Sequence, residues 1–487
     1  MNRREFMLAG AAGMAFAAGG GAFRRPAVAP RGPVRLRLGV LSDIHITDEA
    51  ATAPFKAVLR AFDRWGADGV MVCGDLADYG VIPQLEAVAK AWFEVFPNGK
   101  GHDGRPVANL MHYGDHDTCG YTYRRCKPCV AMFPDEAAMK KVIIPLNDRK
   151  AVWERCFREP WAPIVHKRVK GYDFALAHFT RGEKGNESGN NTPGLEAFLA
   201  GLKLDPTRPF FYSQHRVYRN TACGPHVWGQ EDGMVGALFA SKYPNVVAFC
   251  GHAHQCAVND QCVWQGAFTA IQVPSLRYCL TLGGRENGFS LTDRAAPQIV
   301  RTMPEMRVGE GYDFTRQGYF VTVYDNCMVV RRHEFKQGVS LGTDWVIPFP
   351  SPGERPHAFA ARQKVVPAPQ FPDGAAIAVK TIQAKDRSGT ARDMYELTFP
   401  PAASTAVTPR ANEYEVCVEQ AFDDVVKTVA TRRFYAADYI YGAEKKTVVC
   451  RMLKSDVPAG VLTRFVVNPM NAYYVRGNPI RTEFPEK

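Results

Sequence analysis

The sequence predicts an α/β domain followed by a smaller all-β domain, and three observations support this fold class. Over residues 34–349, short apolar runs alternate with segments whose apolar residues recur at helical spacing, which is the order expected of sheets covered by helices. Residues 350–374 are rich in proline and predict an extended linker or a strap across the first domain. Residues 375–487 contain short alternating runs separated by turn residues, which predict a β-sandwich.

The elements of both domains can be assigned in order along the chain. In the first domain, strands are predicted at residues 34–41, 70–73, 108–113, 172–179, 210–213, 246–250, 268–273 and 319–324. Helices are predicted over residues 55–65, 81–96 and 234–243, and from Thr192, because threonine caps a helix and Pro193 suits its first turn. In the second domain, strands are predicted at residues 376–381, 394–398, 413–419, 431–436, 446–453 and 462–467. Residues 464–478 resemble the last hairpin of a fibronectin type III module.

The first 29 residues predict an export signal. Arg3 and Arg4 are followed by Phe6 and by a mildly hydrophobic run rich in alanine and glycine. This pattern resembles a twin-arginine signal peptide, with cleavage after either Ala22 or Ala29. We therefore expect the twin-arginine translocation machinery as a partner, a periplasmic or extracellular location, and no membrane span in the mature chain.

Composition excludes several classes of protein. The chain has 487 residues, of which 46% are hydrophobic, so it is long and apolar enough for large cores. Its net charge of +11 is spread along the sequence, which favours a solvated basic surface over a nucleic-acid groove. The mature region contains neither a Walker A loop, nor a Gly-x-Ser-x-Gly elbow, nor a dinucleotide-binding glycine motif. Cys73 and Cys250 are expected to be core thiols, whereas Cys417 and Cys450 could form a bridge or remain two thiols.

Five short motifs at the ends of predicted strands carry the chemistry. They are Asp43 and His45 in Leu-Ser-Asp-Ile-His, Asp75 and Asp78 in Cys-Gly-Asp-Leu-Ala-Asp, Asp115, His116 and Asp117 in Tyr-Gly-Asp-His-Asp, His215 in Tyr-Ser-Gln-His, and His252 and His254 in Phe-Cys-Gly-His-Ala-His. Carboxylate and imidazole groups suit Zn, Mn and Fe, and ligands of open α/β sheets bind at the carboxyl ends of strands. On an extended segment, an Asp-x-His or His-x-His pair points both side chains the same way. Seven ligand-type side chains exceed the needs of one tetrahedral ion, so two ions that share a carboxylate fit better.

With these motifs, residues 34–330 resemble the calcineurin-like metallophosphoesterase superfamily, whose signature is Asp-x-His, Gly-Asp, Gly-Asn-His-Asp/Glu, His and Gly-His-x-His. The resemblance implies a four-layer α/β/β/α sandwich with two metal ions (Fe, Mn or Zn) at one end. It implies that Asp43, His45, Asp75 and His254 bind the first ion, and that Asp75, Asp115, His215 and His252 bind the second. It also implies that His116 faces the leaving group and is oriented by Asp117. The implied activity is hydrolysis of a small phosphomonoester or phosphodiester by a metal-activated hydroxide.

The sequence departs from the family pattern at Asp115, where the family usually has asparagine. The additional carboxylate predicts tighter metal binding that favours a trivalent ion such as Fe(III), together with a less acidic bridging water, or else a shift from catalysis towards binding. Position 78 is aspartate, whereas purple acid phosphatases place a metal-binding tyrosine there, so that subfamily is disfavoured. Two alternatives to the phosphoesterase remain open: a catalytically weakened binding or adhesion protein, and a nuclease.

Three arginines are candidates for binding the substrate. Arg124 and Arg125 lie on the loop that follows the third motif, and Arg216 is adjacent to His215. A guanidinium group suits a phosphate or carboxylate because it can donate two parallel hydrogen bonds.

Overall fold

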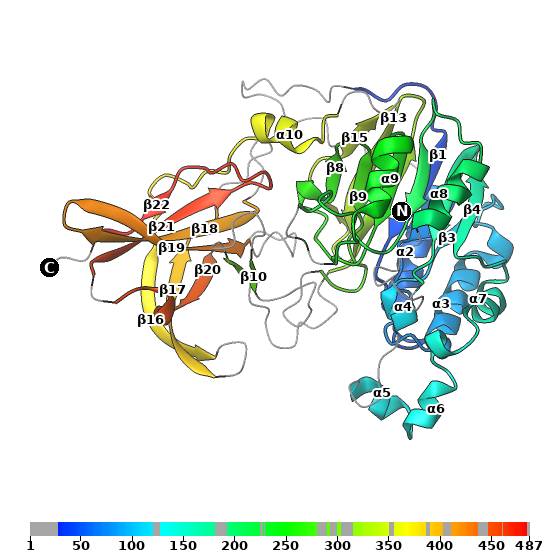
Figure 1. The fold of residues 1–487 in the computed structure, drawn as a ribbon, viewed down its shortest axis with the longest axis horizontal. Helices are drawn as coiled ribbons and strands as arrows, with labels where there is room; N and C mark the ends of the chain where they lie inside the picture. The colour runs from blue at the N-terminus through cyan, green and yellow to red at the C-terminus, as the bar shows by residue number, and fades with distance from the viewer. Residues whose placement is uncertain are drawn as a thin grey trace.

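The computed structural model describes residues 28–119, 127–180, 192–224, 227, 229–279, 290–292, 300–302, 315–349, 355–385, 390–402, 411–436, 447–459 and 461–484. In these ranges the chain forms a larger α/β domain and a smaller β domain (Figure 1). The predicted export signal lies, except for residues 28 and 29, outside the described residues. Within the described part of the chain, none of the helices has the length and apolar character needed to cross a bilayer.

The first central sheet has seven strands in the order β14-β13-β12-β1-β2-β3, with β15 paired to β13. The strands are β1 (Leu36–Leu41), β2 (Gly69–Val72), β3 (Ala108–Met111), β12 (Gln317–Val323), β13 (Cys327–Glu334), β14 (Val339–Ser340) and β15 (Trp345–Pro348). β1, β2 and β3 are parallel, while β12 pairs antiparallel with β1. The carboxyl ends of the three parallel strands, which precede the first three motifs, therefore meet at one edge.

The second central sheet has six strands in the order β4-β5-β6-β7-β9-β8. They are β4 (Ile164–Val169), β5 (Tyr172–Ala177), β6 (Phe210–Ser213), β7 (Val246–Cys250), β8 (Val263–Gln265) and β9 (Thr269–Gln272). β5, β6, β7 and β9 are parallel, so the motifs that follow β6 and β7 also meet at one edge.

The two sheets pack against each other and helices cover their outer faces, which makes the predicted four layers (Figure 1). Leu38 and Val40 of β1 share one apolar core with Phe211 and Phe249 of the second sheet. Helices α2 (Thr52–Trp65), α3 (Ile82–Val95) and α7 (Arg149–Phe157) pack on the first sheet, and α8 (Thr192–Gly201) and α9 (Met234–Lys242) pack on the second. The short helices α4 (Asp115–Cys119), α5 (Lys127–Met132) and α6 (Glu136–Lys140) follow β3. The apolar spacing predicted for α2 places its buried side chains on one face, and a left-handed Gly66 (φ 88°) ends it.

The β domain consists of two sheets with an apolar core between them. One sheet has the order β16-β17-β20 and the other the order β10-β11-β19-β18-β21-β22. The strands are β16 (Ala378–Lys385), β17 (Ala391–Phe399), β18 (Glu413–Phe422), β19 (Val425–Tyr435), β20 (Val448–Leu453), β21 (Thr463–Met470) and β22 (Ile480–Arg481). Leu397, Val416 and Val467 are among the side chains of the core. Cys417 and Cys450 are separate thiols, as are the buried Cys73 and Cys250.

Two strands of the β domain come from the middle of the chain. β10 (Ser290–Thr292) and β11 (Val300–Thr302) pair with each other, and β11 runs parallel to β19. The sequence placed this segment in the first domain. The pairing means that the two domains are joined by main-chain hydrogen bonds as well as by the linker.

The proline-rich linker is not extended throughout, because it contains the helix α10 (Phe359–Val365). The Phe359 ring packs on the Tyr473 ring at a centroid distance of 5.6 Å. His357 Nε2 lies 3.0 Å from the carbonyl oxygen of Val346 on β15. The segment therefore contacts both domains, as expected of a strap.

Candidate metal centre

The motif side chains meet where the central strands end. Asp43 and His45 follow β1, and Asp75 follows β2. Asp115 begins α4 just after β3, while the remaining three residues follow strands of the second sheet: His215 after β6, and His252 and His254 after β7. All seven residues are buried, with at most 6% exposure. The structure thus brings seven residues from five segments to one edge of the sandwich.

The seven side chains form two groups that share one residue. Asp43, His45, Asp75 and His254 make the first group, and Asp75, Asp115, His215 and His252 make the second. Within each group, one ligand atom per residue lies within 4.8 Å of the others. These are the same two sets, with the same shared carboxylate, that the family resemblance implies.

Short distances hold each group together. In the first group, His254 Nε2 lies 2.9 Å from Asp43 Oδ1 and 3.3 Å from His45 Nε2. In the second group, Asp115 Oδ1 lies 3.0 Å from His215 Nε2 and 3.1 Å from His252 Nδ1. His215 Nε2 also lies 3.2 Å from Asp75 Oδ1. Ring nitrogens and carboxylate oxygens therefore converge on two adjacent points.

The backbone of the motifs is not extended, contrary to the sequence-based prediction. Asp43, His45, Asp75, His252 and His254 all have positive φ, between 44° and 68°. This left-handed conformation is uncommon for residues other than glycine and costs free energy. The side chains of Asp43 and His45 converge because successive residues turn sharply, and not because strand side chains alternate.

Glycines allow the motif backbones to approach these side chains closely. A Cβ atom on Gly114 would lie 2.2 Å from both the backbone nitrogen and Oδ1 of Asp75. A Cβ atom on Gly251 would lie 1.8 Å from Ser42 Oγ and 2.6 Å from Asp43 Oδ2. Real Cβ atoms do not come so close, so both positions require glycine.

The far ring nitrogens of three of the four histidines lie close to oxygen atoms of the protein. His254 Nδ1 lies 3.1 Å from the carbonyl oxygen of Tyr278, and His215 Nδ1 lies 2.7 Å from that of Cys73. His45 Nδ1 lies 3.0 Å from Asp78 Oδ1. With Nδ1 directed at these oxygens, each ring turns Nε2 towards its group, where a cation could displace the Nε2 proton and take the lone pair. This is the usual arrangement around metal-binding histidines, and the residues therefore fit a pair of cations.

The electrostatics of the site also suit cations. Burial disfavours the charged form of Asp43, but His254, His215 and His45 outweigh it and hold the pKa of Asp43 below its usual value. Burial likewise opposes protonation of His215, yet the carboxylates of Asp75 and Asp115 raise its pKa well above the usual value. The negative charge that raises the pKa of this buried imidazole also attracts metal cations.

The described contacts of Asp117 are with the backbone: its carboxylate accepts hydrogen bonds from the N–H groups of Leu76 (3.1 Å), Ala77 (2.7 Å) and Gly114 (2.7 Å). It thereby ties the second motif to the third. A role for Asp117 in orienting His116 stays a prediction. The ring of His116 is held by Asp78, whose carbonyl oxygen lies 2.7 Å and whose carboxylate lies 3.8 Å from Nδ1. The contacts of Asp78 could have been suspected only from its place three residues after Asp75.

The predicted substrate-binding arginines are only partly described. Arg124 and Arg125 lie outside the described residues. The half-buried guanidinium of Arg216 lies over the Phe179 ring, 5.6 Å from its centroid. A role for any of the three in binding substrate stays a prediction.

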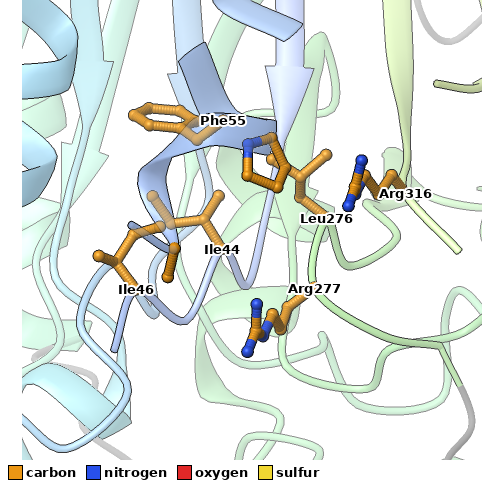
Figure 2. Close-up of a pocket in the computed structure, with 8 residues that line it drawn as sticks. Ile44, Ile46, Phe55, Leu276, Arg277 and Arg316 are labelled. Carbon is orange, nitrogen blue, oxygen red and sulfur yellow. The ribbon is translucent and has the colours of Figure 1, made fainter. Parts of the chain in front are cut away.

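A pocket beside the first motif contains two arginines that the sequence did not single out (Figure 2). Its lining residues are Ile44, Ile46, Ala51, Pro54, Phe55, Leu276, Arg277 and Arg316. Figure 2 shows Ile44, between two metal-site residues, close to the segment that carries Leu276 and Arg277. The pocket therefore lies between the first motif and the loop after β9.

Comparison with known proteins gives one family match. Residues 36–256 match the model of the family described as calcineurin-like phosphoesterase. Among solved structures, the chain is similar to a predicted phosphoesterase from Streptococcus pneumoniae, with 9% identity and a TM-score of 0.25, covering 64% of this chain and 98% of that chain. It is also similar to GAP50, the anchor in the inner membrane complex of Plasmodium, with 11% identity and a TM-score of 0.36, covering 65% of this chain and 89% of that chain. A third similar structure is purple acid phosphatase PPD1 from yellow lupin, Lupinus luteus, with 15% identity and a TM-score of 0.35, covering 66% of this chain and 56% of that chain. No protein with a curated description matches the sequence.

Proposed function

Because residues 36–256 match the model of the calcineurin-like phosphoesterase family, we propose that this protein is a metal-dependent enzyme that hydrolyses a small phosphomonoester or phosphodiester. The observation that carries the proposal is the pair of buried residue groups that share Asp75. Asp43, Asp75 and Asp115 are at most 6% exposed, and three carboxylates buried this close together need compensating positive charge. We propose that each group holds one cation, which is Fe, Mn or Zn.

Three residues of the chain would support the two cations in the reaction. When bound, the two cations supply the Lewis acidity that activates water and neutralises the phosphoryl group. The carboxylate of Asp78, 3.0 Å from His45 Nδ1, attracts the ring that presents Nε2 to the first group. Asp117 holds the second and third motifs in register. His116, fixed through Nδ1, presents its other nitrogen to the departing oxygen and gives it a proton.

The protonation state of His116 agrees with a proton donor. Burial opposes its protonation, but the carboxylates of Asp75, Asp115 and Asp78 outweigh burial and raise its pKa to about 9. At neutral pH the ring of His116 therefore carries the proton that a general acid must give.

Metal content and hydrolysis, measured together, test the proposal. Purified protein should contain close to two equivalents of Fe, Mn or Zn by inductively coupled plasma mass spectrometry. It should also hydrolyse bis(p-nitrophenyl) phosphate or p-nitrophenyl phosphate. Asp75→Asn should lose both properties, whereas Asp103→Asn, the same change at a surface carboxylate, should keep both. Fewer than one equivalent after incubation with excess metal would contradict the proposal.

The two alternative functions predict different results. Two equivalents of metal without hydrolysis of any phosphoester in a broad screen would favour a binding or adhesion protein, consistent with Asp115 in place of the usual asparagine. A nuclease is favoured only by the net charge of +11. It would bind DNA with an affinity that falls steeply as salt is raised.

We also propose that the protein is exported by the twin-arginine machinery, on the strength of the pattern in residues 1–29. Replacement of Arg3 and Arg4 by lysine should retain the protein in the cytoplasm. Fractionation of cells that express the two forms measures this, and equal amounts of both forms outside the cytoplasm would contradict it.

A further inference from the structure

The loop Ser275–Cys279, which follows β9, contacts three of the four residues in the first group. Ser275 Oγ donates to the carbonyl oxygen of Asp43 (2.9 Å), and the Arg277 N–H donates to the same oxygen (3.3 Å). The carbonyl oxygen of Tyr278 accepts from His254 Nδ1. These bonds fix the backbone of one metal-site residue and the ring of another.

The side chain of Tyr278 adds two ring contacts. Its ring lies on that of His254, with centroids 4.4 Å apart, and stacks on that of His45, with centroids 5.4 Å apart and planes inclined by 26°. One aromatic side chain therefore restrains both imidazoles of the first group.

The same loop belongs to the core of the β domain. Tyr278, at 7% exposure, and Cys279, at 0%, pack in one apolar cluster with Phe371 of the linker and with Leu397 of β17. Cys256, two residues after His254, packs in this cluster as well. Further along the chain, β10 pairs with β11, and β11 pairs with β19 of the β domain. The loop is thus packed between the β domain and the first group.

The second group is supported in another way. Asp115 begins α4, and His215 Nδ1 bonds to the carbonyl oxygen of Cys73 at the end of β2. Gly229, on the loop after His215, lets the backbone approach the ring of His252. These supports lie within the α/β domain.

We propose that the β domain acts, through the loop Ser275–Cys279, as a positioning element for the first metal group, with Tyr278 as the positioning residue. This inference rests on the proposed function only in that metal is expected at the group. It predicts an asymmetry: loosening the cluster weakens binding at the first group and spares the second.

Two variants loosen the cluster from opposite sides. Tyr278→Leu removes the ring but keeps an apolar side chain, while Tyr278→Phe keeps the ring and is its matched control. Leu397→Ala acts from within the β domain, and its control is Leu199→Ala, which removes an equally buried leucine from α8. Melting temperatures show whether the variants fold and whether the two leucine variants are comparably destabilised.

Titration of chelator-treated protein with Mn²⁺ measures the two groups. The parent should bind two equivalents. Tyr278→Leu and Leu397→Ala should bind one equivalent with parental affinity and the other about 10- to 100-fold more weakly, the range for residues that orient ligands. Tyr278→Phe and Leu199→Ala should match the parent. Equal weakening of both equivalents, or of neither, would overturn the inference.

Hydrogen–deuterium exchange separates this inference from the proposed function, because it needs no metal. In metal-free Tyr278→Leu, amides of residues 42–46 should exchange faster, while amides of residues 114–119 should be unchanged. That result together with a parent that binds no metal would refute the metal centre and leave the positioning role standing. Unchanged exchange at residues 42–46 would refute the positioning role.

Discussion

Asp78 provides the sharpest test of how the site is held. Its carboxylate, 17% exposed, lies 3.0 Å from His45 Nδ1 and 3.8 Å from His116 Nδ1, so one side chain supports two functional rings. Asp78→Asn keeps the size and shape of the side chain but removes its charge. A polar contact with a charged group contributes about 1.5–3 kcal/mol and one between neutral groups about 0.5–1.5 kcal/mol. The difference of about 1–2 kcal/mol corresponds to a roughly 5- to 30-fold loss of metal affinity at the first group.

The assay is competition between the protein and a chelator for Mn²⁺, resolved into the two equivalents. Only the affinity for the metal equivalent at the first group, which includes His45, should fall. Glu49→Gln makes the same change of charge at an exposed carboxylate that pairs with Lys90, and it should leave both equivalents unchanged. An Asp78→Asn variant within twofold of the parent at both sites would refute the argument that this carboxylate orients His45.

Three further predictions follow from the geometry. Asp115→Asn restores the family residue and removes one negative charge. It should therefore weaken binding of metal at the second group and move the acidic limb of the pH–rate profile to lower pH. Mass spectrometry of the bound metals and initial rates measure these effects, and identical metals and profiles would contradict the prediction. In metal-free protein, burial opposes the charge on His116 but neighbouring carboxylates raise its pKa to about 9, above about 6.5 in the unfolded chain. Its stabilisation should therefore be complete below about pH 6.5 and be lost as the pH rises through about 9, and His116→Gln should remove this slope in urea unfolding; an unchanged slope would refute it. Gly114→Ala should lower the free energy of unfolding by about 1–3 kcal/mol and abolish binding of metal, because its Cβ would lie 2.2 Å from Asp75. Gly201→Ala, at a position with open space, is the control in both measurements. Parental metal binding by Gly114→Ala would contradict the expected clash.

The two groups of metal-site residues could be specified from the sequence, but their supports could not. The motifs name Asp43, His45 and the other candidate ligands, and the family resemblance divides them into the same two sets, sharing Asp75, that the structure brings together. Tyr278 carries no motif, since a lone tyrosine after an apolar strand is ordinary. It meets His45 only because β1 and β9 end at the same edge of the sandwich.

Most core strands were predicted because buried strands are continuous apolar runs. β6 and β7 have the predicted bounds, and β1 begins two residues later than expected. β4 was missed because its sequence, Ile-Val-His-Lys-Arg-Val, is polar on one face, as suits a strand at the edge of its sheet. Helix α10 was missed because prolines on both sides of it dominate the local pattern.

By itself, the sequence determined which groups could do chemistry: carboxylates and imidazoles after apolar runs, glycines at fixed positions, and the alternation that makes an α/β sandwich. These are properties of residue type and spacing, and they act locally. The tertiary structure decided what surrounds each group: the left-handed turns at Asp43 and His254, the contact of Asp78 with His116, and the packing of the β domain behind the first group. Those depend on contacts between segments far apart in sequence, 38 residues for Asp78 with His116 and 232 residues for Asp43 with Ser275, and no local pattern encodes such contacts.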